Sequence, residues 1–145
     1  ARSLRDVLEV RRALEELAIE LACQRMSEEE VGNLQKAQED FKKAIAEGDA
    51  MKIAETDEHF HDVIYEGTQN AKLIQMLNNL REQMYRYRLE YIKDEDKRKI
   101  LVLEHEKILK TVRERKVAEA KEAVREHIDN QEITVARNIT EKENA

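Results

Sequence analysis

Three of the four histidines in this chain of 145 residues fall on apolar stripes of segments with helical periodicity. They are His61, His105 and His127, and Asp57 precedes the first of them by one helical turn. A polar group on a helix face that must be buried needs a partner to offset its desolvation. Asp57 and His61 project from the same side of their helix, so both can hold one ion. With His105 and His127 they form a candidate metal site of one carboxylate and three imidazoles.

The alternative is that each histidine is an ordinary hydrogen-bonded core residue, with Asp57 accepting a bond from His61. That reading needs a separate buried partner for every imidazole, whereas one cation satisfies all four side chains. Imidazole-rich ligation favours a divalent transition metal, with Zn first and Ni, Co, Fe or Mn as alternatives, over Mg or Ca. His59 falls on the opposite, polar face of its helix, and we expect it to bind nothing.

The composition excludes several classes of protein. The chain has no Pro or Trp, three Gly and one Cys, and it is 40% charged and 41% hydrophobic. Nearly all of these residues are good helix formers, so we expect an all-α fold and no β-sandwich or parallel sheet. The length predicts a single domain, residues 1–145. The sequence contains no apolar run that could span a bilayer and no signal-peptide pattern, which predicts a cytoplasmic protein.

The net charge of −6 opposes a polyanionic partner, because nucleic-acid binding modules usually carry a basic face. The chain alone is therefore not expected to bind DNA. Its single cysteine, Cys23, lies among the apolar residues of a helix, and we interpret it as a small buried hydrophobe rather than a nucleophile.

Caps and breakers predict six helices, each with an apolar stripe, that pack as a bundle. Ser27 and Glu30 form a capping box, and Gly48 can end the helix that they start. Asp49 and Asn70 can cap the next two helices. Residues 93–96 are the expected linker, and residues 141–145 are expected to fray. Including their caps, the predicted helices cover residues 3–25, 27–48, 49–67, 70–92, 97–113 and 117–140, with the fourth at the centre.

Three segments resemble the FCD (FadR C-terminal) domain, the ligand-binding domain of the FadR subfamily of GntR-type bacterial transcription regulators. The resemblance covers essentially the whole chain. The segments are Glu9-Val10-Arg11-Arg12-Ala13-Leu14-Glu15, which is similar to the opening helix of the family; Asp57-Glu58-His59-Phe60-His61 continuing to Asn70 and Leu73, which is similar to its D-x-x-F-H…N-x-x-L pattern; and Glu104-His105 followed by His127, which is similar to its paired C-terminal histidines.

The resemblance implies an antiparallel bundle of six or seven helices that holds a divalent metal through Asp57, His61, His105 and His127. In the family, a small effector, commonly a carboxylate, binds at the open positions of the metal. Candidate effector-binding residues here are Arg11, Arg88 and Asn130.

The physics of these three residues leaves alternatives open. Arg11 interrupts the apolar stripe of the first helix, so it needs an anion, which is either the effector or a carboxylate such as Glu15. Arg81 shares one side of its helix with Arg88 and could serve instead. Asn130, one turn after His127, could orient a ligand or a water molecule, or lie on the surface.

The chain departs from the family in two respects. It begins within a few residues of the first bundle helix, so we expect no winged-helix domain in it and DNA binding only through such a domain. Arg115 and Lys116 stand where the family commonly has an Asp cap. The resemblance also predicts a homodimer, and Met84, Tyr87 and Tyr91 are a candidate dimer surface, with core packing as the equal alternative.

These observations predict a sensor of a small carboxylate effector and not an enzyme. A di-iron enzyme would need two Glu-x-x-His pairs, and the sequence has only Glu58-x-x-His61. A mononuclear metalloenzyme remains an alternative, although no general base clearly pairs with the site. A purely structural interaction module is the other alternative, and it predicts that the inward histidines bind nothing.

Overall fold

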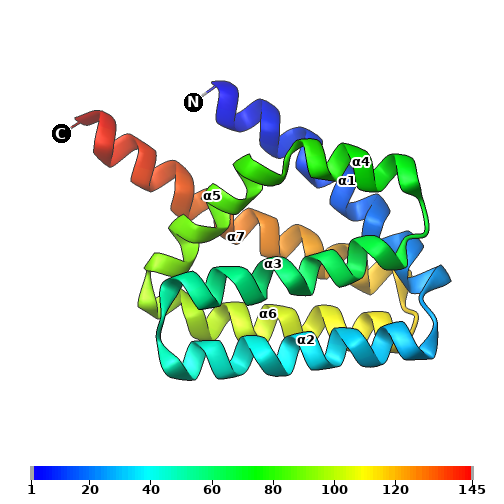
Figure 1. Ribbon diagram of the computed structural model, residues 1–145. Helices are drawn as coiled ribbons and strands as arrows, with labels where there is room; N and C mark the ends of the chain where they lie inside the picture. The colour runs from blue at the N-terminus through cyan, green and yellow to red at the C-terminus, as the bar shows by residue number, and fades with distance from the viewer. Residues whose placement is uncertain (1, 145) are drawn as a thin grey trace.

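The computed structural model describes residues 2–144, and the side chains of residues 4–138. These residues form a bundle of seven α-helices without a β-strand, so the predicted all-α fold is confirmed (Figure 1). The helices are α1 (Arg2–Arg25), α2 (Glu28–Glu47), α3 (Ala50–Gly67), α4 (Ala71–Asn79), α5 (Arg81–Lys93), α6 (Glu95–Arg113) and α7 (Val117–Asn144).

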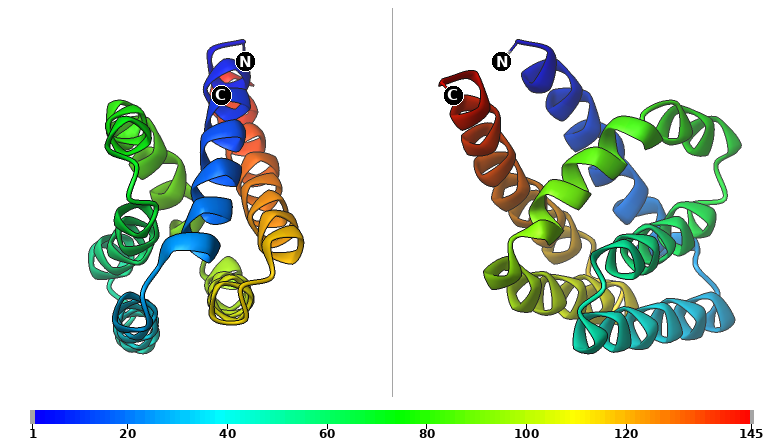
Figure 2. Two further views of the ribbon diagram at one scale, coloured as in Figure 1. Left: turned by 90° about the vertical axis from the view of Figure 1, so that its right-hand side faces the viewer. Right: turned by 60° about the vertical axis from the view of Figure 1, so that its left-hand side comes forward.

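The first and last helices, α1 and α7, lie side by side, and their outer ends point the same way (Figures 1 and 2). Helix α2 packs antiparallel to α3 and also against α6, while α3 reaches both α1 and α5. Helices α1, α3, α5, α6 and α7 therefore enclose the interior of the bundle. None of the described helices is long and apolar enough to cross a membrane.

The predicted long fourth helix, residues 70–92, is divided in two, which corrects that prediction. Leu80 leaves the helical conformation at φ −100° and ψ 0°, and its N–H bonds to the carbonyl of Leu77 in a tight turn. Asn78 and Asn79 precede the break and are weak helix formers. The break lets α4 pack on α1 while α5 packs across α3 and α7, which one straight helix could not do.

Local capping follows the sequence closely. The Ser27–Glu30 capping box is present, and Gly48 ends α2 in the left-handed conformation at φ 78°, where a Cβ atom is disfavoured. Asp49 and Asn70 accept backbone N–H bonds at the starts of α3 and α4. The expected linker at 93–96 is shorter, because Asp94 caps α6 and the helix begins at Glu95.

At the other end of the chain, α7 continues through Asn144, past its predicted end at residue 140, and residue 145 lies outside the described part. Arg115 and Lys116, which stand where the family commonly has an Asp cap, lie in the connection between α6 and α7, and Arg115 has φ 61° there. Arg115 donates to the Cys23 carbonyl at 3.1 Å, which ties this connection to α1.

Two apolar clusters form the core, one larger and one smaller. Met84 and Tyr91 are buried within them, so the candidate dimer surface on α5 is wrong for these two residues and core packing is correct. Cys23 is buried, and burial raises the pKa of its thiol to about 11, as expected for a packed side chain. The ring of His105 lies between the clusters. Its centroid is 4.1 Å from that of the Phe60 ring and 4.3 Å from that of the Phe41 ring.

Candidate metal and anion site

Four side chains singled out in the sequence lie inside the bundle, and three of them, without His127, bring their ligand atoms together. Asp57 and His61 come from α3, His105 from α6 and His127 from α7, and each is at most 3% exposed. One ligand atom from each of Asp57, His61 and His105 lies within 4.8 Å of the others. The His127 ring stacks on that of His61 with centroids 5.4 Å apart. His59 is exposed, as predicted.

Gln38 of α2 fixes the tautomer of His105. The Gln38 amide nitrogen donates to the Val102 carbonyl and to Glu106, each at 3.2 Å, so the amide oxygen must face His105. That oxygen lies 2.9 Å from His105 Nδ1 and can only accept a hydrogen bond. His105 therefore carries its proton on Nδ1.

The other nitrogen of the same ring, His105 Nε2, lies 2.8 Å from Asp57 Oδ1. Burial lowers the pKa of His105, which favours a neutral ring with a lone pair on Nε2. Burial would raise the pKa of Asp57, but the neighbouring histidines more than offset this and hold it well below its usual value. Two electron-pair donors thus face each other in a dry interior, an arrangement that requires a cation or a proton at the contact.

His61 contributes a second unprotonated imidazole. Its Nε2 lies 3.4 Å from Asp57 Oδ1 and makes no hydrogen bond within the described part of the chain. Burial lowers the pKa of this ring to about 3, and the positive charge of Arg88 acts in the same direction. Neutral imidazole is the form that ligates a metal.

His127 is oriented by a carboxylate behind it. Its Nδ1 donates to Glu104 Oε1 at 3.0 Å, which leaves Nε2 buried and, among the described residues, without a partner. The second oxygen of Glu104 accepts from Asn130 Nδ2 at 2.6 Å. A carboxylate that accepts the second N–H of a ligating histidine is the usual outer support of a metal site.

This donor set fits a divalent transition metal. Three imidazoles and one carboxylate suit Zn or a neighbouring metal, and a metal that takes five or six ligands would keep positions open for others. The buried atoms without a described partner include His61 Nε2, His127 Nε2 and Asp57 Oδ2. A cation at the Asp57–His61–His105 cluster would satisfy donors there, and His127 would have to move closer to join them.

Two buried arginines lie beside the histidines and share one carboxylate. Arg11 Nε donates to Glu15 Oε2 at 2.7 Å, and Arg88 Nη2 lies 3.3 Å from Glu15 Oε1. Tyr65 donates to Glu15 and accepts from Arg88 at 2.9 Å. Arg88 Nε also lies 3.8 Å from Asp57 Oδ2, which joins the arginines to the metal ligands.

The two arginines keep the Glu15 carboxylate ionised. Burial would raise the pKa of Glu15, but the charges of Arg11 and Arg88 prevail and hold it well below its ordinary value. The carboxylate alternative for Arg11 is thus present in the structure.

A small enclosed cavity connects the two groups of side chains. Glu15 and Tyr65 line one part of it and His61 and His127 another, and apolar residues complete the wall. Its volume of about 10 Å³ is enough for the centre of one water molecule.

The other two polar candidates lie elsewhere. Arg81 is partly exposed and pairs with Asp62 at 2.8 Å. Asn130 is bound to Glu104, in a groove between α6 and α7.

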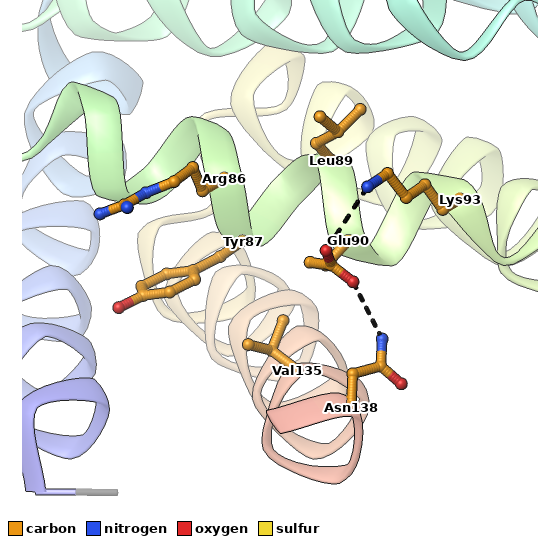
Figure 3. A pocket seen from close by; sticks show the side chains of 7 residues that line it. All are labelled: Arg86, Tyr87, Leu89, Glu90, Lys93, Val135 and Asn138. Atoms are coloured by element: carbon orange, nitrogen blue, oxygen red, sulfur yellow. Dashed lines mark hydrogen bonds and ion pairs between the residues drawn. The ribbon is translucent and has the colours of Figure 1, made fainter. Parts of the chain in front are cut away.

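A roomier groove is a different feature, on the outside between α5 and α7 (Figure 3). It measures about 510 Å³, and Glu90 in its wall contacts Lys93 at 3.5 Å and accepts from Asn138 at 3.3 Å. Its lining combines exposed and half-buried polar groups with half-buried Tyr87 and Leu89 and the buried Val135, and the predicted ligands are not among them.

Sequence reasoning did not assign a role to four residues around the site. Tyr65 follows His61 by one helical turn, as His61 follows Asp57, and this spacing could have indicated it. Gln38 interrupts the apolar stripe of α2 and was visible for that reason. Glu104 carried no such signal, because its role depends on where α6 and α7 meet. Gln131, one turn after His127, is 1% exposed, and neither of its amide atoms has a hydrogen-bond partner within the described region.

The fold and the interior donor set define an all-helical domain with a candidate metal site at its centre. A sequence model of the FCD domain matches residues 6–130, so the chain belongs to the FCD domain family and the resemblance noted from its sequence is confirmed.

Comparison with individual proteins agrees with this assignment. The chain is 26% identical over 131 residues to YdhC of Bacillus subtilis (strain 168), an uncharacterized HTH-type transcriptional regulator, with 90% of this chain and 58% of YdhC covered. The chain thus spans less than two thirds of the length of that relative.

Two solved structures share the fold. McbR/YncC of E. coli superposes with a TM-score of 0.83 at 20% identity, covering 95% of this chain and 69% of that one. GntR of Streptococcus agalactiae superposes with a TM-score of 0.72 at 23% identity, covering 94% and 59%.

Proposed function

We propose that this chain is the effector-sensing domain of a bacterial transcription regulator. It holds a divalent transition metal, Zn first among the candidates, through Asp57, His61, His105 and His127, and it binds a small organic acid beside that metal. The observation that carries this proposal is the contact between His105 Nε2 and Asp57 Oδ1, two acceptors 2.8 Å apart that a metal cation would bridge in place of a proton. The HTH-type regulator YdhC, similar over 90% of the chain, supports the regulatory role.

Charge determines the class of effector. One carboxylate ligand leaves a divalent ion with a local charge near +1, and Arg88 adds a guanidinium within 3.8 Å of Asp57. Glu15 neutralises part of the arginine charge, so the net positive charge beside the metal ligands is smaller than Arg11 and Arg88 alone would give. A metal together with a guanidinium selects an anion with oxygen donors, and a hydroxy or dicarboxylic acid can bridge both.

Sensing requires the acid to prefer one arrangement of the protein. Such couplings are typically about 1–3 kcal/mol. In the proposed regulator, occupancy changes how the two subunits of a cytoplasmic homodimer place their DNA-binding domains. Catalysis is the weaker candidate, because a metal-bound water needs a general base, and the two arginines lower the pKa of Glu15, the carboxylate on the cavity, so far that it is a poor proton acceptor.

Calorimetric titration of the metal-loaded domain tests this function. Acetate, glycolate, malonate and inorganic phosphate serve as probes, against the domain stripped of metal and against Arg81→Ala. We expect at least one organic acid to bind the loaded domain and Arg81→Ala alike, and to lose most of its affinity without metal. Equal binding with and without metal, or no binding by any acid, would contradict the proposal.

A further inference from the structure

We infer that the Glu15 carboxylate is an internal occupant of the arginine pair, and that an acid ligand reaches Arg11 and Arg88 only by displacing it. This inference deepens the proposed function and rests on it for the identity of the competing ligand. It assigns to Glu15 a role in how strongly the domain responds to acids.

The contacts of Glu15 are those of a bound anion. Three donors on three helices converge on one carboxylate: Arg11 from α1 at 2.7 Å, Arg88 from α5 at 3.3 Å, and the Tyr65 hydroxyl from α3. Glu15 is 4% exposed, so water does not compete for these bonds. A free acid that entered the interior would seek the same donors.

The arginine pair has more donors than Glu15 can use. Two guanidinium groups offer ten N–H bonds in all. Arg11 Nη1 and Nη2 and Arg88 Nε are buried and have no hydrogen-bond partner among the side chains and backbone that the structure describes. A single carboxylate leaves this donor set unsatisfied, whereas a second anion, or a larger one in place of Glu15, would satisfy it.

The available space requires displacement rather than addition. The cavity bounded by Glu15, Tyr65, His61 and His127 has room for about one water molecule, which is too little even for acetate. Rotation of the Glu15 side chain away from Arg88 would extend this cavity by the volume of a carboxylate. The enlarged space would still border both His61 and His127, so one acid could reach the arginines and the metal ligands together.

Displacement also changes how the helices are tied together. Glu15 joins α1 to α5 and α3 through Arg88 and Tyr65, and α1 packs along α7, which carries His127. When an acid takes the place of Glu15, that covalently anchored link from α1 is replaced by a free ligand. Acid binding is thereby coupled to the position of α1.

Thermal unfolding of the metal-free domain tests the inference separately from metal sensing. Glu15→Ala removes the internal carboxylate, and Glu16→Ala is the matched control on the same helix, where Glu16 pairs at the surface with Arg125. In chelator with 0.1 M acetate, against chloride at equal ionic strength, we expect the Tm of Glu15→Ala to rise by roughly 3–6 °C. The parent and Glu16→Ala should not respond.

A second variant covers the case in which Glu15→Ala is unfolded. Glu15→Gln keeps the size of the side chain and removes its charge, and its metal-loaded form should bind acetate at least about threefold more tightly than the parent. If Glu15→Ala is unfolded in chloride, acetate should restore its helical circular dichroism. The inference is overturned if acetate neither stabilises nor restores Glu15→Ala, or if Glu15→Gln binds acetate no better than the parent. Because the first test contains no metal, it can succeed where the proposed metal function fails, and the converse also holds.

Discussion

His105 Nε2 faces Asp57 Oδ1 at 2.8 Å while Nδ1 of the same ring donates its proton to Gln38. The amide of Gln38 thus presents the metal-binding nitrogen toward Asp57. Gln38→Leu removes this constraint and lets His105 place its proton on Nε2, where it bonds to Asp57. We expect metal affinity to fall by roughly 10–100-fold.

Competition with a chromophoric chelator measures that loss. Gln35→Leu, at an exposed position on the same helix, is the control and should bind metal as the parent does. An unchanged affinity in Gln38→Leu would show that the tautomer of His105 does not matter for ligation.

Glu104 should support His127 in the same way. Its carboxylate accepts a hydrogen bond from His127 Nδ1 at 3.0 Å. Glu104→Ala should therefore weaken metal binding by about 10–100-fold, while the ligands other than His127 stay in place. Glu126→Ala removes an exposed glutamate of α7 that pairs with Lys107, and it should have no effect. The same competition assay applies, and equal losses in both variants would point to general destabilisation instead.

Acid should destabilise the metal-free domain through His61. The pKa of His61 is about 3 in the folded state, because of burial and Arg88, against an ordinary value of 6.5. Between these values the unfolded state binds more protons, so the free energy of unfolding falls as the pH drops from 6.5 toward 3. His61 contributes at most about 1.4 kcal/mol per pH unit to this slope.

Urea unfolding in chelator at several pH values measures the slope. His61→Asn should flatten it, whereas His59→Asn, at an exposed position of the same helix, should leave it unchanged. An identical slope in the parent and in His61→Asn would show that His61 is not the source of the pH dependence.

The two arginines of α5 should differ in their contribution to stability. Arg88 is 2% exposed and faces Glu15 and Asp57, so Arg88→Ala leaves buried negative charge uncompensated and should cost roughly 3–5 kcal/mol. Arg81 pairs with Asp62 at a partly exposed position, and Arg81→Ala should cost about 1 kcal/mol or less. Chemical denaturation of both variants is the measurement, and similar losses would mean that the buried cluster is not held by charge.

Much of the fold could be predicted from local chemistry. Ser27, Gly48, Asp49 and Asn70 marked helix ends because each acts on backbone atoms within a few residues. The division at Leu80 could not be predicted in this way, because the apolar stripe runs through it without interruption. It arises from the need of α4 and α5 to pack on different partners, a property of the whole bundle.

The site likewise has a part that could be predicted from local sequence and a part that depends on how the helices pack. Asp57, His61, His105 and His127 could be selected because each is a polar residue on a buried face, and burial of all four is confirmed. Gln38 was visible in the same way, but the histidine that each partner orients was not, since Gln38 meets His105 and Glu104 meets His127 at separations of 67 and 23 residues in sequence. Arg11 required an anion, and Glu15, one turn further along α1, was one of the two candidates. That Arg88 of α5 and Tyr65 of α3 share this carboxylate could not be predicted.

The central claim is that one metal ion sits among Asp57, His61, His105 and His127. An anomalous difference map from crystals of the domain, purified without chelator and recorded on both sides of the zinc absorption edge, tests it most directly. We predict one peak per chain, about 2.0–2.2 Å from a nitrogen of each histidine and from an Asp57 oxygen. A map without a peak at this position after growth in excess zinc, or with its peak at surface carboxylates alone, would contradict the account.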